Sequence, residues 1–213
     1  MDALIQRWER VKASVEAVAS RAGREVTLVA ISKTHSVEAI RTLYEAGQRH
    51  FGESRLQEAV GKIEVLPNDI VWHFVGQLQS NKARRISGLF DVVQTISNER
   101  QLIELSKGPK PIDVLIEVNI ANEPQKGGIS PENVVPFAQK VLQYSHANLR
   151  GLMTIGPMRE NSEEMRPFFR ELRLLNERIG GEWLSMGMSA DYEVAIQEGS
   201  THVRVGTAIF GER

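Results

Sequence analysis

The chain has 213 residues, of which 41% are hydrophobic and 25% are charged, and its formal net charge is −1 at pH 7. This composition is that of a soluble globular protein with a full core, and the charge gives no argument for nucleic-acid or anionic-membrane partners. The absence of cysteine excludes disulfides and thiolate metal sites. Charges interrupt the N-terminal segment and no run reaches the ~20 apolar residues of a membrane span, so we expect no signal peptide, no membrane anchor and a cytoplasmic location.

Helical and strand patterns alternate along the chain. Leu4, Trp8, Val11 and Val15 recur at helical spacing and predict a first amphipathic helix that ends at Gly23. Apolar runs then predict eight strands, at residues 26–32, 50–52, 70–75, 90–94, 112–120, 149–153, 183–185 and from 201 onward. Helical patterns separate these strands, at residues 37–46, 56–65, 81–87, 99–106, 131–144, 162–179 and 190–198.

Repeated strand–helix units of this length indicate a parallel sheet, and eight of them indicate a sheet that closes on itself. The sequence therefore predicts an α/β fold, a single (β/α)8 TIM barrel with an extra N-terminal helix, as one domain over residues 1–213. An open doubly wound sheet is the main alternative. It is disfavoured because no Gly-rich G-x-G-x-x-G turn follows the first strand.

The C-terminal part of the chain has the pattern of a phosphate site. Ser189 stands at the expected N-cap of the last helix, and Gly199 follows that helix as its C-terminal glycine. A capped helix start presents N–H groups and a positive dipole end to an anion. Gly206 and Thr207 follow the last strand and add backbone and hydroxyl donors, in the region where TIM barrels commonly hold phosphate.

Two basic side chains are expected at the same end of the barrel. Lys33 follows Val29 and Ile31 on one face of the first strand, and Arg204 lies on the last strand two residues before Gly206. Alone, each is more often a solvated or salt-bridged side chain. Together with a phosphate pattern they favour a phosphorylated aldehyde held by a lysine amine. A cofactor-free phosphosugar enzyme, with a carbonyl-binding lysine, is an alternative.

Other chemistry-bearing residues give weaker signals. The five histidines show no metal-ligand spacing, so we expect no metal site, and His202 is interpreted as a satisfied barrel histidine. Met153, Met186 and Met188 are candidates to pad a flat ring, although methionine more often fills a core. The cluster at residues 82–85 is interpreted as a solvated helix face.

Several long motifs resemble one known family. They are LVAISKT at residues 28–34, EAGQRHFGE at 45–53, WHFVGQLQSNK at 72–82, EVNI at 117–120, LRGLM at 149–153 and the two C-terminal motifs. With them the chain resembles the pyridoxal phosphate homeostasis protein family, which is related to the N-terminal barrel of alanine racemase. The resemblance extends over residues 26–213.

The resemblance implies pyridoxal 5′-phosphate (PLP) as the cofactor. It implies that Lys33 forms a Schiff base with PLP, that Arg204 faces the pyridine nitrogen, and that the phosphate is held by Ser189, Gly206 and Thr207. Ser54 stands where the family often has asparagine, beside the cofactor. Met153 and Met186 complete the set of expected cofactor-binding residues.

An arginine opposite the ring nitrogen has a chemical consequence. Because guanidinium stays protonated, it leaves the ring a poor electron sink, which disfavours most chemistry on amino acids. Alanine racemases add a tyrosine from a C-terminal domain, whereas Tyr44, Tyr144 and Tyr192 occupy no strand end here. We therefore expect a monomeric PLP carrier in intracellular PLP homeostasis, which buffers PLP or delivers it to apo enzymes without robust turnover. A weak amino-acid racemase or another PLP-dependent enzyme is the alternative.

Overall fold

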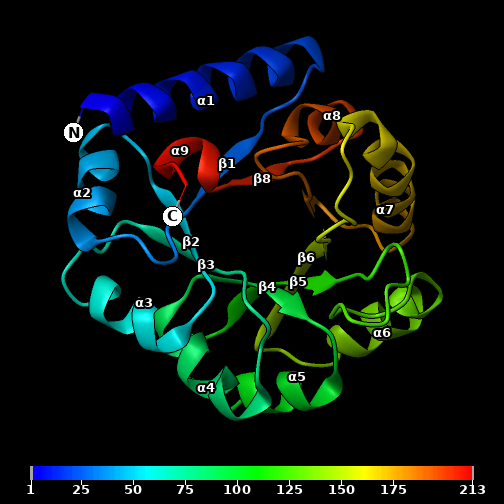
Figure 1. The fold of residues 1–213 in the computed structure, drawn as a ribbon. Helices are drawn as coiled ribbons and strands as arrows, with labels where there is room; N and C mark the ends of the chain where they lie inside the picture. The colour runs from blue at the N-terminus through cyan, green and yellow to red at the C-terminus, as the bar shows by residue number, and fades with distance from the viewer. Residues whose placement is uncertain (1, 213) are drawn as a thin grey trace.

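The computed structural model describes residues 2–212, whose strands form a closed parallel barrel in chain order (Figure 1). The strands are β1 (Thr27–Ile31), β2 (His50–Glu53), β3 (Val71–Phe74), β4 (Val92–Ile96), β5 (Ile112–Glu117), β6 (Ala147–Met153), β7 (Trp183–Ser185) and β8 (His202–Val205). Pairing of β1 with β8 closes the barrel and sets Val29 opposite Arg204. The expected TIM barrel is confirmed, and the open doubly wound sheet is wrong.

Helices surround the barrel, as Figure 1 shows. They are α1 (Asp2–Arg21), α2 (Val37–Glu45), α3 (Leu56–Ile63), α4 (Ser80–Leu89), α5 (Glu99–Leu105), α6 (Val134–Val141), α7 (Arg166–Arg178), α8 (Tyr192–Gln197) and α9 (Thr207–Phe210), with 3-10 turns η1 (Pro131–Asn133) and η2 (Ser162–Met165). The extra N-terminal helix is present as α1, whereas α9 was not expected from the sequence. Within residues 2–212, none of the helices has the length and apolarity needed to cross a membrane.

The barrel has an apolar outer layer and a polar interior. Outward-facing side chains such as Phe51, Trp72 and Phe74 join the helices in one buried apolar cluster. Because strand side chains alternate, the neighbouring positions face the barrel axis, and there His73 and Gln94 are fully buried. A buried polar interior requires internal hydrogen-bond partners. These interior hydrogen bonds extend to Arg204 at the carboxyl ends of the strands.

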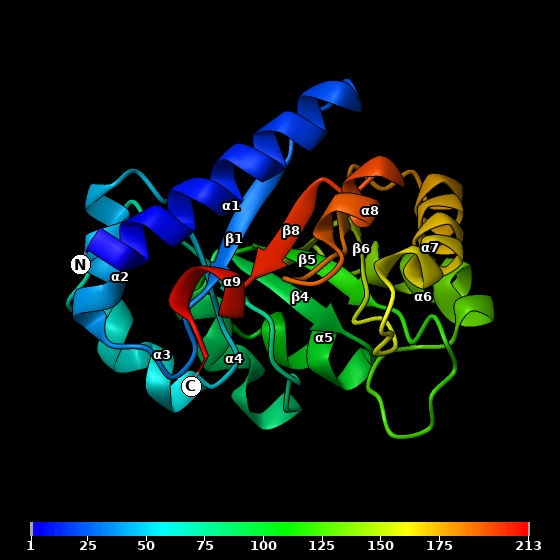
Figure 2. The ribbon, with the colours of Figure 1, turned by 45° about the horizontal axis from the view of Figure 1, so that its top comes forward.

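Helix α1 packs along α8 and α9, beside β1 and β8 (Figure 2). Arg7 donates from Nε to the Ile209 carbonyl oxygen at 2.8 Å and from Nη2 to that of Phe210 at 3.2 Å. The last carbonyls of a helix have no intrahelical partner, so Arg7 satisfies the end of α9. The Tyr192 hydroxyl of α8 donates to Ser14 of α1 at 3.0 Å. Helix α1 thus holds both C-terminal helices in place.

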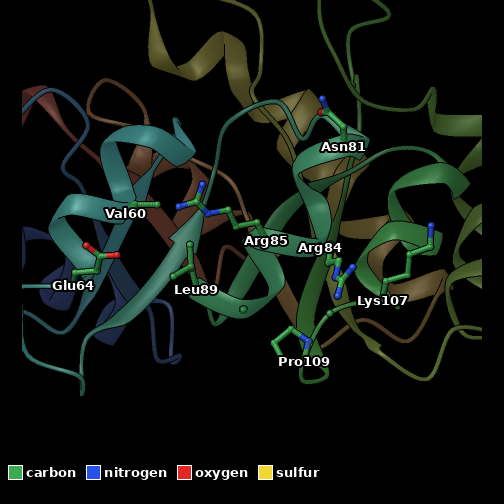
Figure 3. Close-up of a pocket in the computed structure, with 10 residues that line it drawn as sticks. Val60, Glu64, Asn81, Arg84, Arg85, Leu89, Lys107 and Pro109 are labelled. Atoms are coloured by element: carbon green, nitrogen blue, oxygen red, sulfur yellow. The ribbon is translucent and has the colours of Figure 1, made fainter.

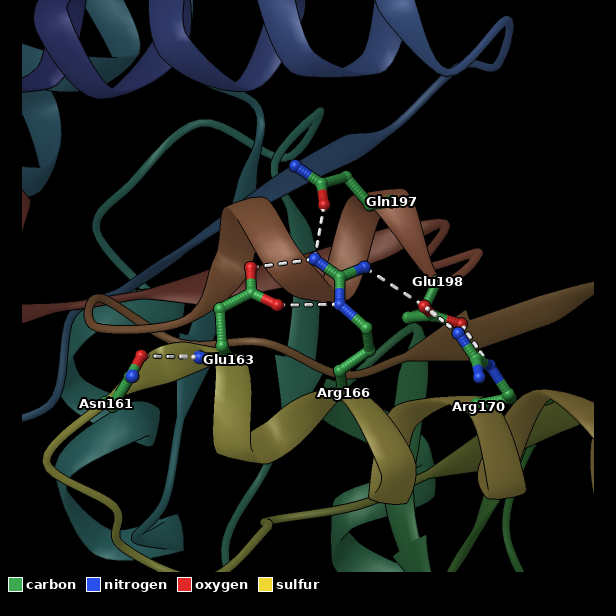
Figure 4. A network of polar contacts seen from close by, with 6 residues as sticks. All are labelled: Asn161, Glu163, Arg166, Arg170, Gln197 and Glu198. Carbon is green, nitrogen blue, oxygen red and sulfur yellow. Dashed lines mark hydrogen bonds and ion pairs between the residues drawn. The ribbon is translucent and has the colours of Figure 1, made fainter.

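An ion-pair network ties the C-terminal end of α8 to α7 (Figure 4). Arg166 makes a two-pronged contact with Glu163, with both donor–acceptor distances at 2.7 Å. It also donates to Gln197 at 2.7 Å and to Glu198 at 3.0 Å. Arg170 donates to the same Glu198 carboxylate at 3.0 Å. Held by α1 on one side and α7 on the other, α8 fixes the loop that leaves β7.

Candidate functional site

A cavity of about 340 Å³ opens at the carboxyl ends of the strands, and we call it the barrel-mouth cavity. Its volume falls in the range of ligand pockets, about 300–1,000 Å³. Side chains from β1, β8 and the loops after β1, β2, β3, β6, β7 and β8 line it, namely Ile31, Lys33, His35, Ser54, Val75, Ile155, Met188, Ser189, Ala190, Arg204, Gly206, Thr207 and Gly211. The structure therefore brings together six predicted site residues, which are Lys33, Ser54, Ser189, Arg204, Gly206 and Thr207.

A larger cavity of about 560 Å³ lies outside the barrel along α4 (Figure 3). Arg85 extends from α4 toward Val60 of α3, whereas Arg84 lies on the side of Lys107 (Figure 3). The cations of this cavity therefore do not converge on one point. No barrel strand and none of the predicted site residues lines it. Size alone does not identify the functional site, and the converging groups are at the barrel mouth.

The loop after β7 differs from its prediction. Helix α8 begins at Tyr192, with Asp191 as its N-cap residue, rather than at Ala190 after a Ser189 cap. The Asp191 carboxylate accepts a hydrogen bond from the Met188 N–H at 2.6 Å, which closes a turn before the helix. Ser189 instead accepts the backbone N–H of Ala208 at 3.3 Å. The predicted N-cap role of Ser189 is wrong, yet Ser189 still lines the cavity.

Helix α9 begins where β8 ends, at the wall of the cavity. Gly206 is its N-cap residue, and Thr207 and Ala208 form its first turn. A Cβ at Gly206 would lie 3.4 Å from the Ile31 Cβ, so the start of α9 lies directly against β1. The His35 ring stacks on Phe210 with 4.3 Å between ring centroids, which joins α9 to the loop after β1. A short extra helix after strand 8 is a usual part of TIM-barrel phosphate sites.

Arg204 forms the floor of the cavity and is 4% exposed. Its Nη1 donates to the Ser185 hydroxyl at 2.6 Å, and its Nη2 donates to the Thr154 carbonyl oxygen at 2.7 Å. Burial lowers the pKa of Arg204 to about 10, against the opposing charges of Asp191 and Glu117. The guanidinium therefore stays protonated at neutral pH. It is a fixed donor that lines the cavity.

A chain of hydrogen bonds continues from Arg204 through the barrel interior. Ser185 Oγ lies 2.7 Å from Gln94 Oε1, Gln94 Nε2 lies 2.9 Å from His73 Nδ1, and His73 Nε2 lies 3.0 Å from His50 Nδ1. Arginine can only donate, so Ser185 accepts from it and passes its own hydrogen to Gln94. The amide then donates to His73, and His73 donates to His50. All hydrogen bonds of the chain therefore run in one direction, away from Arg204 and toward His50.

Both histidines of this chain are neutral in this arrangement. Burial lowers the pKa of His73 well below its ordinary value, and it lowers the pKa of His50 as well. Burial also lowers the pKa of His202 to about 3, and its Nδ1 lies 2.8 Å from the Thr201 hydroxyl. His202 is thus a satisfied barrel histidine, as its sequence position suggested. No group of His, Asp or Glu side chains suited to a metal ion occurs in residues 2–212.

Met153 and Met186 are the two predicted site residues that the structure does not bring to the cavity. Both side chains are fully buried, and neither lines the barrel mouth. Met153 lies opposite Ser185 in the β6–β7 pairing, inside the barrel. Met186 follows Ser185 and belongs to the outer apolar cluster. The methionine at the cavity is Met188, because the loop after β7 carries it past the strand end.

Comparison with known proteins identifies the class first. The family model for the N-terminal domain of alanine racemase matches residues 7–213. A pyridoxal phosphate homeostasis protein of Aquifex aeolicus is 40% identical over 222 residues, covering 98% of this chain and 97% of that protein. One of Escherichia coli is 40% identical over 233 residues, covering 100% and 98%. The chain belongs to the pyridoxal phosphate homeostasis protein family, within the alanine racemase N-terminal domain class.

Solved structures agree with this assignment. PipY of Synechococcus elongatus without PLP has a TM-score of 0.88 and 32% identity, covering 98% of this chain and 100% of that one. PipY with PLP bound has a TM-score of 0.83, 31% identity and the same coverage. Alanine racemase of Corynebacterium glutamicum has a TM-score of 0.72 at 17% identity, covering 100% of this chain and 61% of that one. The racemase shares the fold.

Proposed function

We propose that this protein binds PLP in the barrel-mouth cavity and takes part in PLP homeostasis, as a carrier that buffers the cofactor or delivers it to apo enzymes. The family membership and the PLP-bound form of PipY support this proposal. The observation that carries it is the convergence of Lys33, Arg204 and the Ser189–Ala208 wall on one cavity. An amine, a fixed cation and a set of hydroxyl and backbone donors match an aldehyde, a pyridine and a phosphate.

Each lining residue has a part in holding the cofactor. Among the described residues, Lys33 is the one lysine that lines the cavity. Its amine makes no hydrogen bond or ion pair with any of them. We assign Lys33 as the covalent attachment point and Arg204 as the residue facing the ring nitrogen. Ser189, Gly206 and Thr207 hold the phosphate. PLP supplies an aldehyde, whose oxygen leaves as water when the lysine nitrogen bonds to its carbon.

Ser54 is assigned to the cofactor edge. It lines the barrel-mouth cavity from the loop after β2. Its hydroxyl is a short side chain that offers both a donor and an acceptor. Met153 and Met186 are not part of the proposed site, because they lie away from the cavity.

Arg204 favours carriage over turnover. A guanidinium whose pKa is about 10 does not transfer its proton to a pyridine nitrogen at neutral pH. An unprotonated ring stabilises developing carbanions poorly, so reactions that pass through a carbanion of a bound amino acid are disfavoured. What the site retains is reversible binding, which is the property a buffer or a delivery protein needs.

The covalent link is tested by spectroscopy and mass spectrometry. Protein incubated with PLP is expected to absorb in the visible, to lose that band on borohydride reduction, and to carry one cofactor mass on the Lys33 peptide. Lys33→Ala is expected to bind PLP without a covalent link and with lower affinity. A cofactor mass on another lysine contradicts the assignment of Lys33.

The carrier role is tested by proton exchange and by transfer. We expect the PLP-loaded protein to exchange the Cα hydrogen of L-alanine or L-serine in heavy water no faster than Lys33→Ala does. We also expect it to reactivate an apo PLP enzyme faster than an equal amount of unbound PLP. Exchange on the order of 1 s⁻¹, an enzyme-like rate, would instead support the racemase alternative.

A further inference from the structure

A buried lysine on α3, Lys62, is bonded to the residue that precedes Lys33. Lys62 Nζ donates to the Ser32 carbonyl oxygen at 2.8 Å, to Glu53 Oε1 at 2.7 Å and to Glu58 Oε1 at 2.6 Å. Three donated bonds require three hydrogens on the nitrogen, so Lys62 is an ammonium ion. Its side chain is only 7% exposed. Lys62 is therefore held in place by three acceptors, from β2, α3 and the residue before Lys33.

The same cluster fixes the residue before Lys33. Ser32 is fully buried, and its hydroxyl donates to Glu53 Oε1 at 2.7 Å while its carbonyl oxygen accepts from Lys62. Its N–H donates to the Gly52 carbonyl oxygen at 3.0 Å, which continues the β1–β2 pairing. Every polar group of Ser32 is thus bonded to β2 or α3. The peptide that leads into Lys33 has a single arrangement.

The residue after Lys33 is fixed by the other carboxylate. Thr34 has a φ of 69°, the left-handed conformation that is unfavourable for a β-branched residue. Such a residue costs roughly 1–3 kcal/mol and persists where its surroundings determine it. Its N–H donates to Glu58 Oε1, the same oxygen that accepts from Lys62. Lys33 is therefore bracketed by two residues that one charged cluster holds.

Stability alone does not account for this cluster. Glu53 is fully buried, and burial raises the pKa of its carboxyl. Its Oε2 atom makes no hydrogen bond within the described residues. Burying such ions costs several kcal/mol each, and well-packed apolar residues often serve stability equally well. A cluster of this kind is better explained by the geometry that it imposes on its neighbours.

We propose that Glu53, Glu58 and Lys62 are positioning residues for Lys33, which hold its backbone so that its amine faces the barrel-mouth cavity. They act through Ser32 and Thr34 and do not contact the cofactor. This inference rests on the proposed function, because it concerns the rate at which Lys33 reacts with bound PLP.

The test separates binding from attachment with two probes. PLP reports covalent attachment, and pyridoxine 5′-phosphate, which has an alcohol in place of the aldehyde, reports non-covalent binding alone. The central variants are Glu58→Ala, which removes the acceptor for the Thr34 N–H, and Glu58→Gln, which keeps an oxygen at that position. Lys62→Met tests the other contact. Lys140→Met is the matched control, since it breaks the 2.9 Å pair with Glu99 on the outer helices.

We expect Glu58→Ala to attach PLP about tenfold to a hundredfold more slowly, because small misplacements of a reacting group have effects of this size. Its affinity for pyridoxine 5′-phosphate is expected to stay unchanged. Glu58→Gln is expected to restore most of the attachment rate, and Lys140→Met to match the wild type. If Lys62→Met does not fold, the Glu58 pair still decides the question.

Two outcomes overturn the inference. One is an unchanged attachment rate in folded Glu58→Ala. The other is a parallel loss of attachment and of pyridoxine 5′-phosphate binding, which would make the cluster a general support of the fold. Failure of the proposed function has a different signature, because the wild type itself would then bind neither probe in the barrel-mouth cavity.

Discussion

The backbone N–H of Ala208 donates a hydrogen bond to the Ser189 hydroxyl oxygen at 3.3 Å. This bond joins the loop after β7 to the first turn of α9, two segments that are separate in the sequence pattern. Because the hydroxyl accepts from Ala208, its own hydrogen is directed elsewhere and is available to an anion in the cavity. The two halves of the expected phosphate site thus form one continuous wall.

Removing this hydroxyl should weaken phosphate binding. Ser189→Ala deletes a donor to the phosphate and leaves the Ala208 N–H without its acceptor. We expect the affinity for pyridoxine 5′-phosphate to fall about tenfold, the size of one hydrogen bond near 1.4 kcal/mol. Titration by intrinsic fluorescence measures it. Ser106→Ala, which removes a hydroxyl bonded to Leu102 on α5, is the control, and equal affinities for the two variants would contradict the placement of the phosphate.

Gly206 offers a pair of variants that differ by one carboxylate. A Cβ added to Gly206 would lie 3.4 Å from the Ile31 Cβ, an ordinary contact, so Gly206→Ala is expected to fold and to bind PLP. Gly206→Asp adds a negative charge beside the phosphate and is expected to lose at least about tenfold more affinity than the alanine variant. Equilibrium dialysis with PLP compares them. If the two variants bind equally, the α9 start does not hold the phosphate.

The interior hydrogen-bond chain should contribute to stability. Ser185 is fully buried, and Ser185→Ala leaves Arg204 Nη1 and Gln94 Oε1 each without a partner. We expect the free energy of unfolding to fall by about 1–3 kcal/mol, the cost of leaving buried polar groups unpaired. Urea denaturation measures this loss. A variant as stable as the wild type would mean that water replaces the hydroxyl in the chain.

Buried histidines should make the protein less stable at lower pH. Burial lowers the pKa of His202 from 6.5 to about 3, so below pH 6.5 the unfolded chain binds a proton that the folded protein does not. Its stabilising contribution is therefore present above pH 6.5 and falls by about 1.4 kcal/mol per pH unit as the pH decreases toward 3.

The comparison of His202→Gln with the wild type isolates this contribution. Glu53, Glu117 and Asp191 have raised pKa values and act in the opposite sense as the pH falls. Because they are present in both proteins, they cancel in the difference. Between pH 7.5 and 5.5 the stability of His202→Gln should depend less on pH than that of the wild type. Parallel curves from urea denaturation would mean that His202 titrates alike in the folded and unfolded states.

The parts of the site that regular strands carry could be predicted from the sequence. Side chains alternate along a strand, so Lys33 and Arg204 could be assigned to the inner face, and the Val29–Arg204 pairing agrees with that assignment. By the same rule, the neighbours Ser185 and Met186 point to opposite faces of the sheet. The sequence could therefore have shown that Met186 faces the helices.

The parts that depend on tertiary contacts could not be predicted. Ser189 and Asp191 are both good N-cap residues, and the contact with Ala208 decides between them. A helix as short as α9 leaves no periodic signal, although the glycines that flank it at positions 206 and 211 are a hint. Lys62 has the pattern of a solvated helix lysine, and only the meeting of α3 with β2 buries it.

The contact of Arg7 with Ile209 spans 202 positions of the chain. During synthesis the chain emerges N-terminus first, so α1 leaves the ribosome long before the helix that it must hold. Closing so large a loop also makes this contact slow to form. A growing chain therefore has no finished barrel mouth until α9 has been synthesised and packed against α1.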